Sequence, residues 1–409
     1  MIQHLSIRPA HPRLSRLKLM VLSTAMAAFL GFAGCAKNPP PPDTSPQPLP
    51  LNSFTRLWAI ETHQKYGKLN QVFMRGDYIF AYSRTGNVCM VGRNDGHLIA
   101  VSDIRHGREQ LRPPVVLRDR VVYPTNSSFE MYELTGGFIG SKDVSYSVRS
   151  NAVGSGSYVY VGADFQNGGR VVKVDITRKF PDHVWELMFA GVSVSSGPAL
   201  VGDALYAAGE NGKVTAVDVD SREPLWSLEG GFFSSYGSIV ADLVADEANL
   251  YIACEDGTLT VLNRSNGRVR WKYIAGVPLH ATPAVTRDMV FQYVPGTGLV
   301  AFGKTEGAFV RTPRWVASDV SEFLAEDEKY VYGRRTDNAI LAMEKTSGRA
   351  AFTSRRRDFV AFAHDTTGGM IYTVTTAGRI MAIKPVLTPG GVGEVAFAPV
   401  AREPLSSAQ

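Results

Sequence analysis

Cysteine is scarce in this sequence. Its 409 residues include three cysteines, Cys35, Cys89 and Cys254, and no two of them are adjacent or stand in a Cys-x-x-Cys arrangement. A disulfide framework needs an even set of cysteines at regular spacings, and covalently attached haem needs Cys-x-x-Cys-His. The sequence therefore argues against a fold held by disulfides and against a c-type haem site.

An excess of charge of one sign is also missing once the first 34 residues are set aside. The formal net charge is +5, of which Arg8, Arg13, Arg16 and Lys18 supply four in a stretch without acidic residues. A remainder so close to neutral gives no reason to expect nucleic acid as a partner. The arginine run at 355–357 is predicted to be a solvated strand or loop.

Recognisable catalytic and metal-binding patterns are absent. Six histidines follow residue 34, at positions 63, 97, 106, 183, 280 and 364, and no two of them stand at a metal-ligand spacing. His364 and Asp365 form the one adjacent histidine–acid pair, and the Thr-Thr-Gly-Gly turn after them predicts a surface loop. No Gly-x-Ser-x-Gly, Walker or dinucleotide-binding pattern stands between a strand and a helix. We therefore predict no catalytic or metal site, and no enzyme.

The one long hydrophobic run extends from residue 19 to residue 34 and is too short for a comfortable membrane span. It follows the basic residues named above and ends in LGFAGC at 30–35, which resembles a bacterial lipobox. This pattern predicts a lipoprotein signal peptide at 1–34 and lipidation of Cys35 after cleavage. An ordinary signal peptide that contains a cysteine by chance is the alternative.

Proline is concentrated just after Cys35, with seven prolines between residues 39 and 50. Such a segment favours an extended tether of about 3.1 Å per residue. We predict that residues 35–51 hold a folded body off a membrane. Ala36, in place of Asp, favours the outer membrane, with the body facing the periplasm, and the sequence leaves the inner membrane open. Residues 389–409, rich in Gly and Pro, are predicted to be a poorly ordered tail.

The body of the chain contains a repeat. An apolar residue followed by Tyr or Phe recurs at the end of the first legible strand of each unit, and a Gly or Asn turn follows most copies. The eight pairs are 37 to 46 residues apart and start at residues 79, 122, 159, 205, 250, 290, 331 and 371. A period in the low forties with four strands per period is typical of a β-propeller. We predict an all-β fold, an eight-bladed propeller of four-stranded antiparallel blades over residues 52–388.

A second motif within the repeat carries a family resemblance. AVDVDSREPLW, ending at Trp226, and VLNRSNGRVRW, ending at Trp271, follow the pattern Ala-x-Asp-x-x-Thr-Gly-x-x-x-Trp with substitutions. Residues 342–352 follow it with Phe at the end, and Trp185 follows Val174-Asp175 after a longer turn. No tryptophan is followed by aspartate, as WD40 repeats would require. The chain resembles the PQQ-like, or quinoprotein, propeller family.

The last repeat ends near residue 385 without its tryptophan, and the missing segment stands at the front as FTRLWAI, residues 54–60. We predict that this segment supplies the outer strand of the last blade and closes the ring. The repeat tryptophans Trp58, Trp185, Trp226 and Trp271 are expected to pack between neighbouring blades, with cofactor stacking as the alternative. Cys89 and Cys254 would lie in blades one and five, too far apart to pair.

The resemblance has implications for function. Quinoprotein dehydrogenases share a vicinal cysteine pair and have much longer chains. This sequence has neither feature, so we expect no PQQ or other cofactor here. A lipidated periplasmic propeller of eight blades is similar to the BamB-type accessory lipoproteins of outer-membrane β-barrel assembly. That similarity implies a monomeric, non-catalytic scaffold whose rim loops bind protein partners, among them the POTRA domains of the barrel insertase. Two alternatives stay open: a propeller that binds another envelope protein or a cell-wall component, and a binder of quinone or a small ligand.

Overall fold

The computed structural model describes residues 47–48, 54–62, 65–104, 111–229, 237–305, 308–354 and 357–385. The chain divides into two compact units, Met1–Asp43 and Thr44–Gln409, and all described residues belong to the second. All the regular secondary structure in the described part consists of β-strands, which confirms the all-β prediction. That part contains no helix able to cross a membrane. The predicted signal peptide, Cys35, most of the tether and the tail lie outside the described residues.

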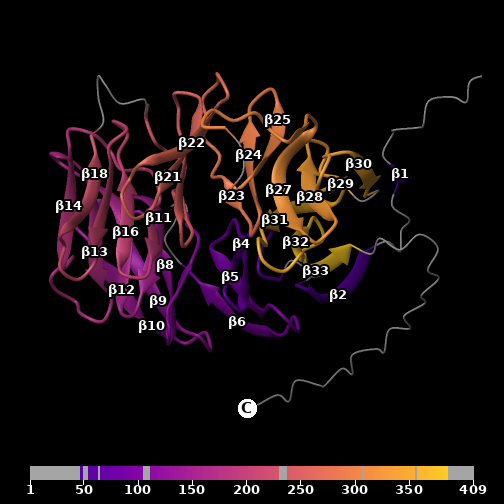
Figure 1. The fold of residues 1–409 in the computed structure, drawn as a ribbon. Coiled ribbons are helices and arrows are strands. Elements are labelled where there is room, and N and C mark those ends of the chain that lie inside the picture. Colours follow the sequence, from indigo (N-terminus) through magenta and orange to yellow (C-terminus); the bar gives the residue numbers. More distant parts are fainter. Residues whose placement is uncertain are drawn as a thin grey trace, which may run out of the picture. The chain divides into compact units, whose positions relative to one another are not determined.

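The strands of the described part form eight sheets that follow one another around a ring, one for each predicted repeat (Figure 1). We number these sheets as blades one to eight. Each blade has four antiparallel strands, counted outward from the centre of the ring, which confirms the predicted eight-bladed propeller.

Blades one to four are built as follows. Blade one contains β3 (Leu69–Arg75), β4 (Tyr78–Ser83), β5 (Asn87–Gly92) and β6 (Leu98–Asp103), and blade two contains β7 (Val115–Val116), β8 (Arg120–Pro124), β9 (Ser128–Glu133) and β10 (Phe138–Asp143). Blade three contains β11 (Ser147–Ser155), β12 (Tyr158–Phe165), β13 (Gly168–Asp175) and β14 (Trp185–Ala190), and blade four contains β15 (Ala199–Val201), β16 (Ala204–Ala208), β17 (Val214–Asp218) and β18 (Pro224–Leu228).

Blades five to eight complete the ring. Blade five contains β19 (Val244–Ala245), β20 (Asn249–Ala253), β21 (Thr258–Asn263) and β22 (Val269–Ile274), and blade six contains β23 (Ala284–Val285), β24 (Met289–Val294), β25 (Gly298–Gly303) and β26 (Trp315–Ala317). Blade seven contains β27 (Val320–Glu326), β28 (Tyr330–Arg335), β29 (Ile340–Glu344) and β30 (Ala350–Thr353), and blade eight contains β31 (Phe359–Ala363), β32 (Ile371–Thr375), β33 (Arg379–Pro385) and β2 (Phe54–Glu61).

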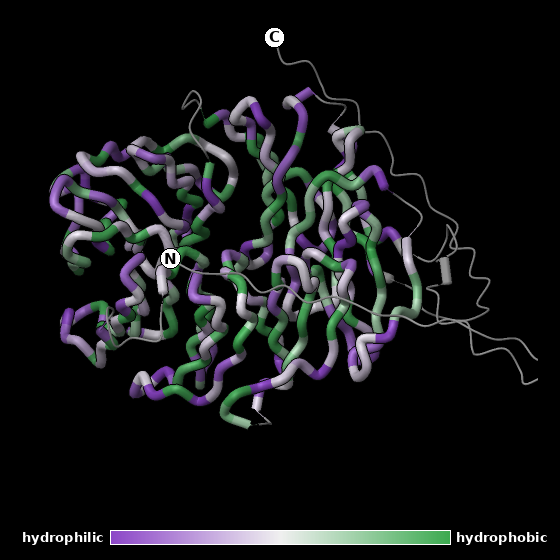
Figure 2. Tube along the Cα trace, turned by 90° about the horizontal axis from the view of Figure 1, so that it is seen from above, coloured by the Kyte–Doolittle hydropathy of each residue, from purple (hydrophilic) through white to green (hydrophobic). Residues whose placement is uncertain are grey.

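The core lies in the seams between blades. Each of eight apolar clusters joins two consecutive blades, including blade eight to blade one. Hydrophobic residues follow the strands, whereas many of the connecting turns are hydrophilic (Figure 2). Because a single sheet exposes both faces, the ring buries them by stacking each blade on its neighbours.

The repeated apolar–aromatic pair lies in the second strand of every blade, and not in the first, where the sequence had suggested it. The reason is the length of the innermost strand. In blades two, five and six that strand has two residues, β7, β19 and β23, which is too short for an alternating pattern. The second strands are continuous apolar runs because both of their faces are buried.

The N-terminal strand closes the ring as predicted. β2 pairs antiparallel with β33, and Trp58 lies opposite Ala382. The hydroxyl of Thr62, directly after β2, donates to the carbonyl oxygen of Gly378 at 2.7 Å. Blade eight is therefore assembled from residues near both ends of the described chain, and with β2 it has four strands like the other blades.

The turn glycine of the repeat makes room for the tryptophan of the preceding blade. Gly267 of blade five has a φ of +69°, and a Cβ placed on it would lie 2.7 Å from the ring of Trp226 in blade four. Gly96 faces Trp58 and Gly348 faces Trp315 in the same way. Glycine and tryptophan therefore recur together because the indole ring lies on the turn of the next blade.

Replacing Gly267 with alanine is expected to destabilise the protein by about 2–4 kcal/mol, from the strained positive φ together with overlap with the Trp226 ring. Gly276→Ala is the matched control, because Gly276 has a φ of +73° but no atom within 4 Å of its added Cβ. Chemical denaturation of both variants separates the two costs. Equal losses would show that the Trp226 contact contributes nothing.

The outer edges of two blades are covered by other parts of the chain. β1 (Gln47–Pro48) pairs parallel with β30 of blade seven, so that this sheet has a fifth strand. In blade six, the loop between β25 and β26 reaches back to blade five, where Val310 forms a parallel bridge with Lys272 of β22. Covering an edge satisfies its backbone groups and protects it from other strands.

The two cysteines of the described part lie in blades one and five, as predicted. Cys89 is in β5 and Cys254 directly follows β20, and both are buried free thiols. Burial raises the pKa of the Cys89 thiol to about 11 and that of the Cys254 thiol to about 12. Both groups therefore remain unreactive thiols at neutral pH.

Candidate functional site

A hollow of about 950 Å³ opens where turns join the first and second strands of blades five to eight. We call this end of the ring the turn face; it also carries the turns between third and fourth strands. The lining is rich in charged residues, which come from four successive turns and from the ends of β25, β29 and β33. It consists of 244–246, 285–288, 326–328 and 366–369 with Lys304, Lys345 and Lys384.

An aspartate recurs in the first turn of blades five, seven and eight, as Asp246, Asp327 and Asp365. One carboxylate oxygen of each accepts backbone N–H groups two and three residues later, which fixes the turn. The second oxygen accepts a hydrogen bond from Tyr251 in blade five and from Tyr332 in blade seven. The side chains of these two buried repeat tyrosines therefore reach the turns with their hydroxyl groups.

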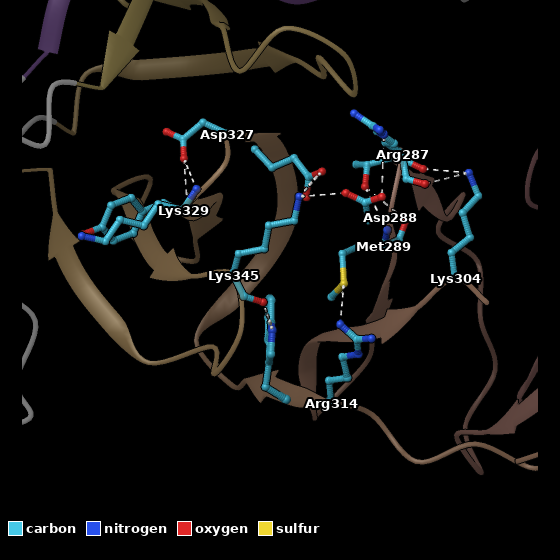
Figure 3. A network of polar contacts seen from close by, with 12 residues as sticks. Arg287, Asp288, Met289, Lys304, Arg314, Asp327, Lys329 and Lys345 are labelled. Atoms are coloured by element: carbon cyan, nitrogen blue, oxygen red, sulfur yellow. Dashed lines mark hydrogen bonds and ion pairs between the residues drawn. The ribbon is translucent and has the colours of Figure 1, made fainter. Parts of the chain in front are cut away.

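Cations from the next blade complete this arrangement. Lys304 Nζ of blade six lies 2.9 Å from Asp246 Oδ2 of blade five, and Arg93 of blade one lies 3.0 Å from Asp365 Oδ2 of blade eight. Lys345 Nζ lies 2.9 Å from Glu326 Oε1 and 3.9 Å from Asp288 Oδ2 (Figure 3). The first two pairs and the Lys345–Asp288 pair join neighbouring blades on the turn face, whereas Lys345 and Glu326 both belong to blade seven.

The Asp246 carboxylate of this arrangement stays ionised near neutral pH. Burial disfavours the Asp246 carboxylate, but hydrogen bonds from Lys304, the backbone and Tyr251 outweigh it, so its pKa is lowered. Burial and the hydrogen bond to Asp246 raise the pKa of Tyr251. The described residues contain no cluster of three His, Cys, Asp or Glu side chains that could hold a metal. The charged residues of both signs allow the hollow to contact charged or polar groups of a partner.

The predicted repeat tryptophans are distributed around the ring and do not share a site. The indole N–H donates to a carbonyl of the following blade from Trp58, Trp185 and Trp226, at 2.9, 3.2 and 2.8 Å. The indole N–H of Trp271 has no hydrogen-bond acceptor among the described residues. The guanidinium of Arg311, from the blade-six loop, stacks over the Trp271 ring at 4.3 Å instead.

A fifth tryptophan holds the same position in blade six and was missed in the sequence. Trp315 lies opposite Ala301 and donates to the carbonyl of Lys345 at 2.9 Å. The loop between β25 and β26 lengthens the spacing that marks the other copies, which hid this one. The sequence did contain a signal for it, because Trp315 is the one tryptophan that follows the strands of the sixth repeat.

The prediction that His364 and Asp365 lie on a surface loop is wrong for Asp365. Asp365 is fully buried, because its carboxylate binds the turn after it and Arg93. His364 is half-exposed, and its Nε2 lies 2.7 Å from Glu322 Oε1. The two side chains have different partners and do not act as a pair. His63 and His106 lie outside the described residues.

An exposed aromatic side chain marks the loop at 176–184 in blade three. Phe180 is 72% exposed, the most among the large hydrophobic residues of the described part. The loop is tied to blade two, because Lys142 Nζ donates to the carbonyls of residues 178, 179 and 181 at 2.7–3.2 Å. Asp182 accepts the backbone N–H and the hydroxyl of Ser145. Phe180 is therefore displayed on a fixed loop.

Comparison with known proteins places this fold in a family. Residues 125–354, which include blades three to seven, match the family described as outer membrane protein assembly factor BamB. The BamB of Yersinia pestis is 27% identical over 143 residues, 31% of this chain and 35% of that protein. The BamB of Pseudomonas aeruginosa is 29% identical over 180 residues, 40% of this chain and 44% of that protein. The matches thus span less than half of either relative.

Solved structures show the same fold at low identity. BamB from Moraxella catarrhalis superposes with a TM-score of 0.62 at 17% identity, covering 81% of this chain and 97% of that one. The computationally designed Ika8 protein gives 0.59 at 14%, with 80% and 98% covered. The C-terminal WD40 domain of Sif2 gives 0.60 at 11%, with 82% and 99% covered. Because the family profile matches more than half of the sequence, the chain belongs to the family of the outer membrane protein assembly factor BamB.

Proposed function

We propose that this protein is a non-catalytic, lipid-anchored periplasmic scaffold that takes part in outer-membrane protein assembly by binding protein partners. The family match across blades three to seven carries this proposal. In it, residues 1–34 are the signal peptide, Cys35 is lipidated on the outer membrane, residues 35–51 are the tether and residues 389–409 are a tail. The partner is a POTRA domain of the barrel insertase, bound by a monomer.

The loop at 176–184 is the surface that best suits such a partner. Protein interfaces gain most of their affinity from a few aromatic or arginine anchors, and a fixed anchor loses little entropy on binding. Phe180 is exposed on a loop held by Lys142 and Asp182. Arg178, 73% exposed beside it, adds a polar contact for the rim of the interface.

Photo-crosslinking in the native envelope tests this proposal. A photoreactive amino acid at Phe180 is expected to capture the insertase through its POTRA domains, as identified by mass spectrometry. The same group at Leu57, 51% exposed in blade eight, is the matched control and is expected to capture little of it. Capture of another envelope protein or of cell-wall material from both positions, without the insertase, would overturn the assembly role. Quinone or another small ligand recovered with the native protein would overturn the purely structural role.

A further inference from the structure

The position of β1 indicates where the chain leaves the propeller toward its N-terminus. Gln47 pairs with Phe352 and Pro48 with Thr353 on the outer edge of blade seven, and the pairing is parallel. β30 begins at Ala350, directly after the turn that contains Lys345 and Gly348, and runs away from the turn face. A parallel neighbour enters from the same end. The chain therefore enters β1 from the side of the turn face.

The length of chain before β1 limits the distance to the lipidated residue. Gln47 lies twelve positions after Cys35, with eleven residues between them. Even a fully extended segment of that length spans only about 40 Å. The turn of blade seven must lie within this reach of any membrane that holds Cys35, whereas the far side of the ring is under no such limit.

We propose that the turn face at blade seven is the side of the propeller that lies toward the lipid surface. This inference rests on the lipid anchor of the proposed function. We attribute the orientation to the docked β1 and not to electrostatic attraction. The ion pairs of the hollow leave few unbalanced charges that could attract lipid head groups. Lys304 is paired with Asp246 and Lys345 with Glu326. The orientation is therefore expected to persist at high salt.

Distance-dependent quenching measures this orientation. The lipidated full-length protein is placed on vesicles of phosphatidylethanolamine and phosphatidylglycerol that carry a head-group quencher. A fluorophore is attached to Thr346→Cys on the turn of blade seven, to Ala377→Cys between β32 and β33 of blade eight, or to Ser155→Cys at the end of β11 in blade three. All three positions are exposed. The buried thiols of Cys89 and Cys254 do not compete for the label.

Quenching is expected to be several-fold stronger at Thr346→Cys than at Ala377→Cys or Ser155→Cys. Equal quenching at the three positions, or an order that places Thr346→Cys last, would overturn the orientation and leave the anchored scaffold intact. Retention on vesicles after a salt wash is measured alongside, with Cys35→Ser as the unanchored control. Wild-type protein that washes off as easily as Cys35→Ser would overturn the anchor and this inference together.

Two insertions test whether β1 itself fixes the orientation. A flexible Gly–Ser insert after Asn38 lengthens the chain between lipid and β1 and is expected to weaken quenching at Thr346→Cys. The same insert after Pro50 lies between β1 and β2 and is expected to leave quenching unchanged. If both inserts weaken it equally, the anchor is held by β2 alone and the role of β1 is refuted.

Discussion

Replacing Trp58 with alanine is expected to lower the free energy of unfolding by about 3–5 kcal/mol. Trp58 is 8% exposed, lies against Gly96 and donates its indole N–H to the carbonyl of Arg93 in blade one. It is therefore shared by blade eight, which holds it, and by blade one, which it covers. The loss includes the cavity left in the seam that closes the ring, and chemical denaturation monitored by the remaining tryptophans measures it.

Leu57→Ala is the matched control for this variant. Leu57 neighbours Trp58 in the same strand but is 51% exposed, so its truncation is expected to change stability by less than about 0.5 kcal/mol. If the two variants unfold at the same denaturant concentration, the closing seam does not depend on the tryptophan.

Replacing Arg93 with alanine is expected to cost about 3 kcal/mol or more, because it leaves the buried Asp365 carboxylate without its cation. Arg93 donates to Asp365 Oδ2 at 3.0 Å and to the hydroxyl of Tyr372 at 3.0 Å. Asp365 is fully buried, so the orphaned charge cannot be solvated without opening the turn. Urea denaturation at neutral pH gives the change in free energy.

A double-mutant cycle with Asp365→Asn separates the ion pair from the packing of Arg93. Once the carboxylate is gone, removing Arg93 is expected to cost much less than it does in the wild type. Arg287→Ala controls for loss of positive charge on the turn face, because Arg287 is 93% exposed. Additive losses in the cycle would show that the two side chains are not coupled.

Much of the fold could be predicted because it is written in local patterns that repeat. The second strands are long, apolar and aromatic, and the missing tryptophan of the last unit pointed to residues 54–60. The innermost strands could not be predicted from periodicity, since several have only two residues and are specified by their neighbours. Trp315 was hidden because the loop before it interrupts the spacing.

The turn-face hollow could not be predicted in the same way. Its aspartates and lysines lie about forty residues apart in the chain, and the ring brings them together. A local signal did exist: Asp246 precedes Tyr251, and Asp327 precedes Tyr332, by the same five residues. This spacing predicts a carboxylate that accepts the tyrosine hydroxyl. The cation from the next blade follows only from the three-dimensional arrangement.

The pairing of β2 with β33 determines the order in which the chain can reach its final state when it emerges N-terminus first. Thr62 and Gly378, which bond directly, are 316 residues apart in the sequence. β2 stays unpaired until the eighth blade has emerged, because its partner strand, β33, is the last strand of the described chain to be made. Closing so long a loop is slow, and until it closes the first and last blades each leave one apolar face unstacked. The half-finished chain, rather than the finished propeller, is therefore the form that most needs a holding chaperone.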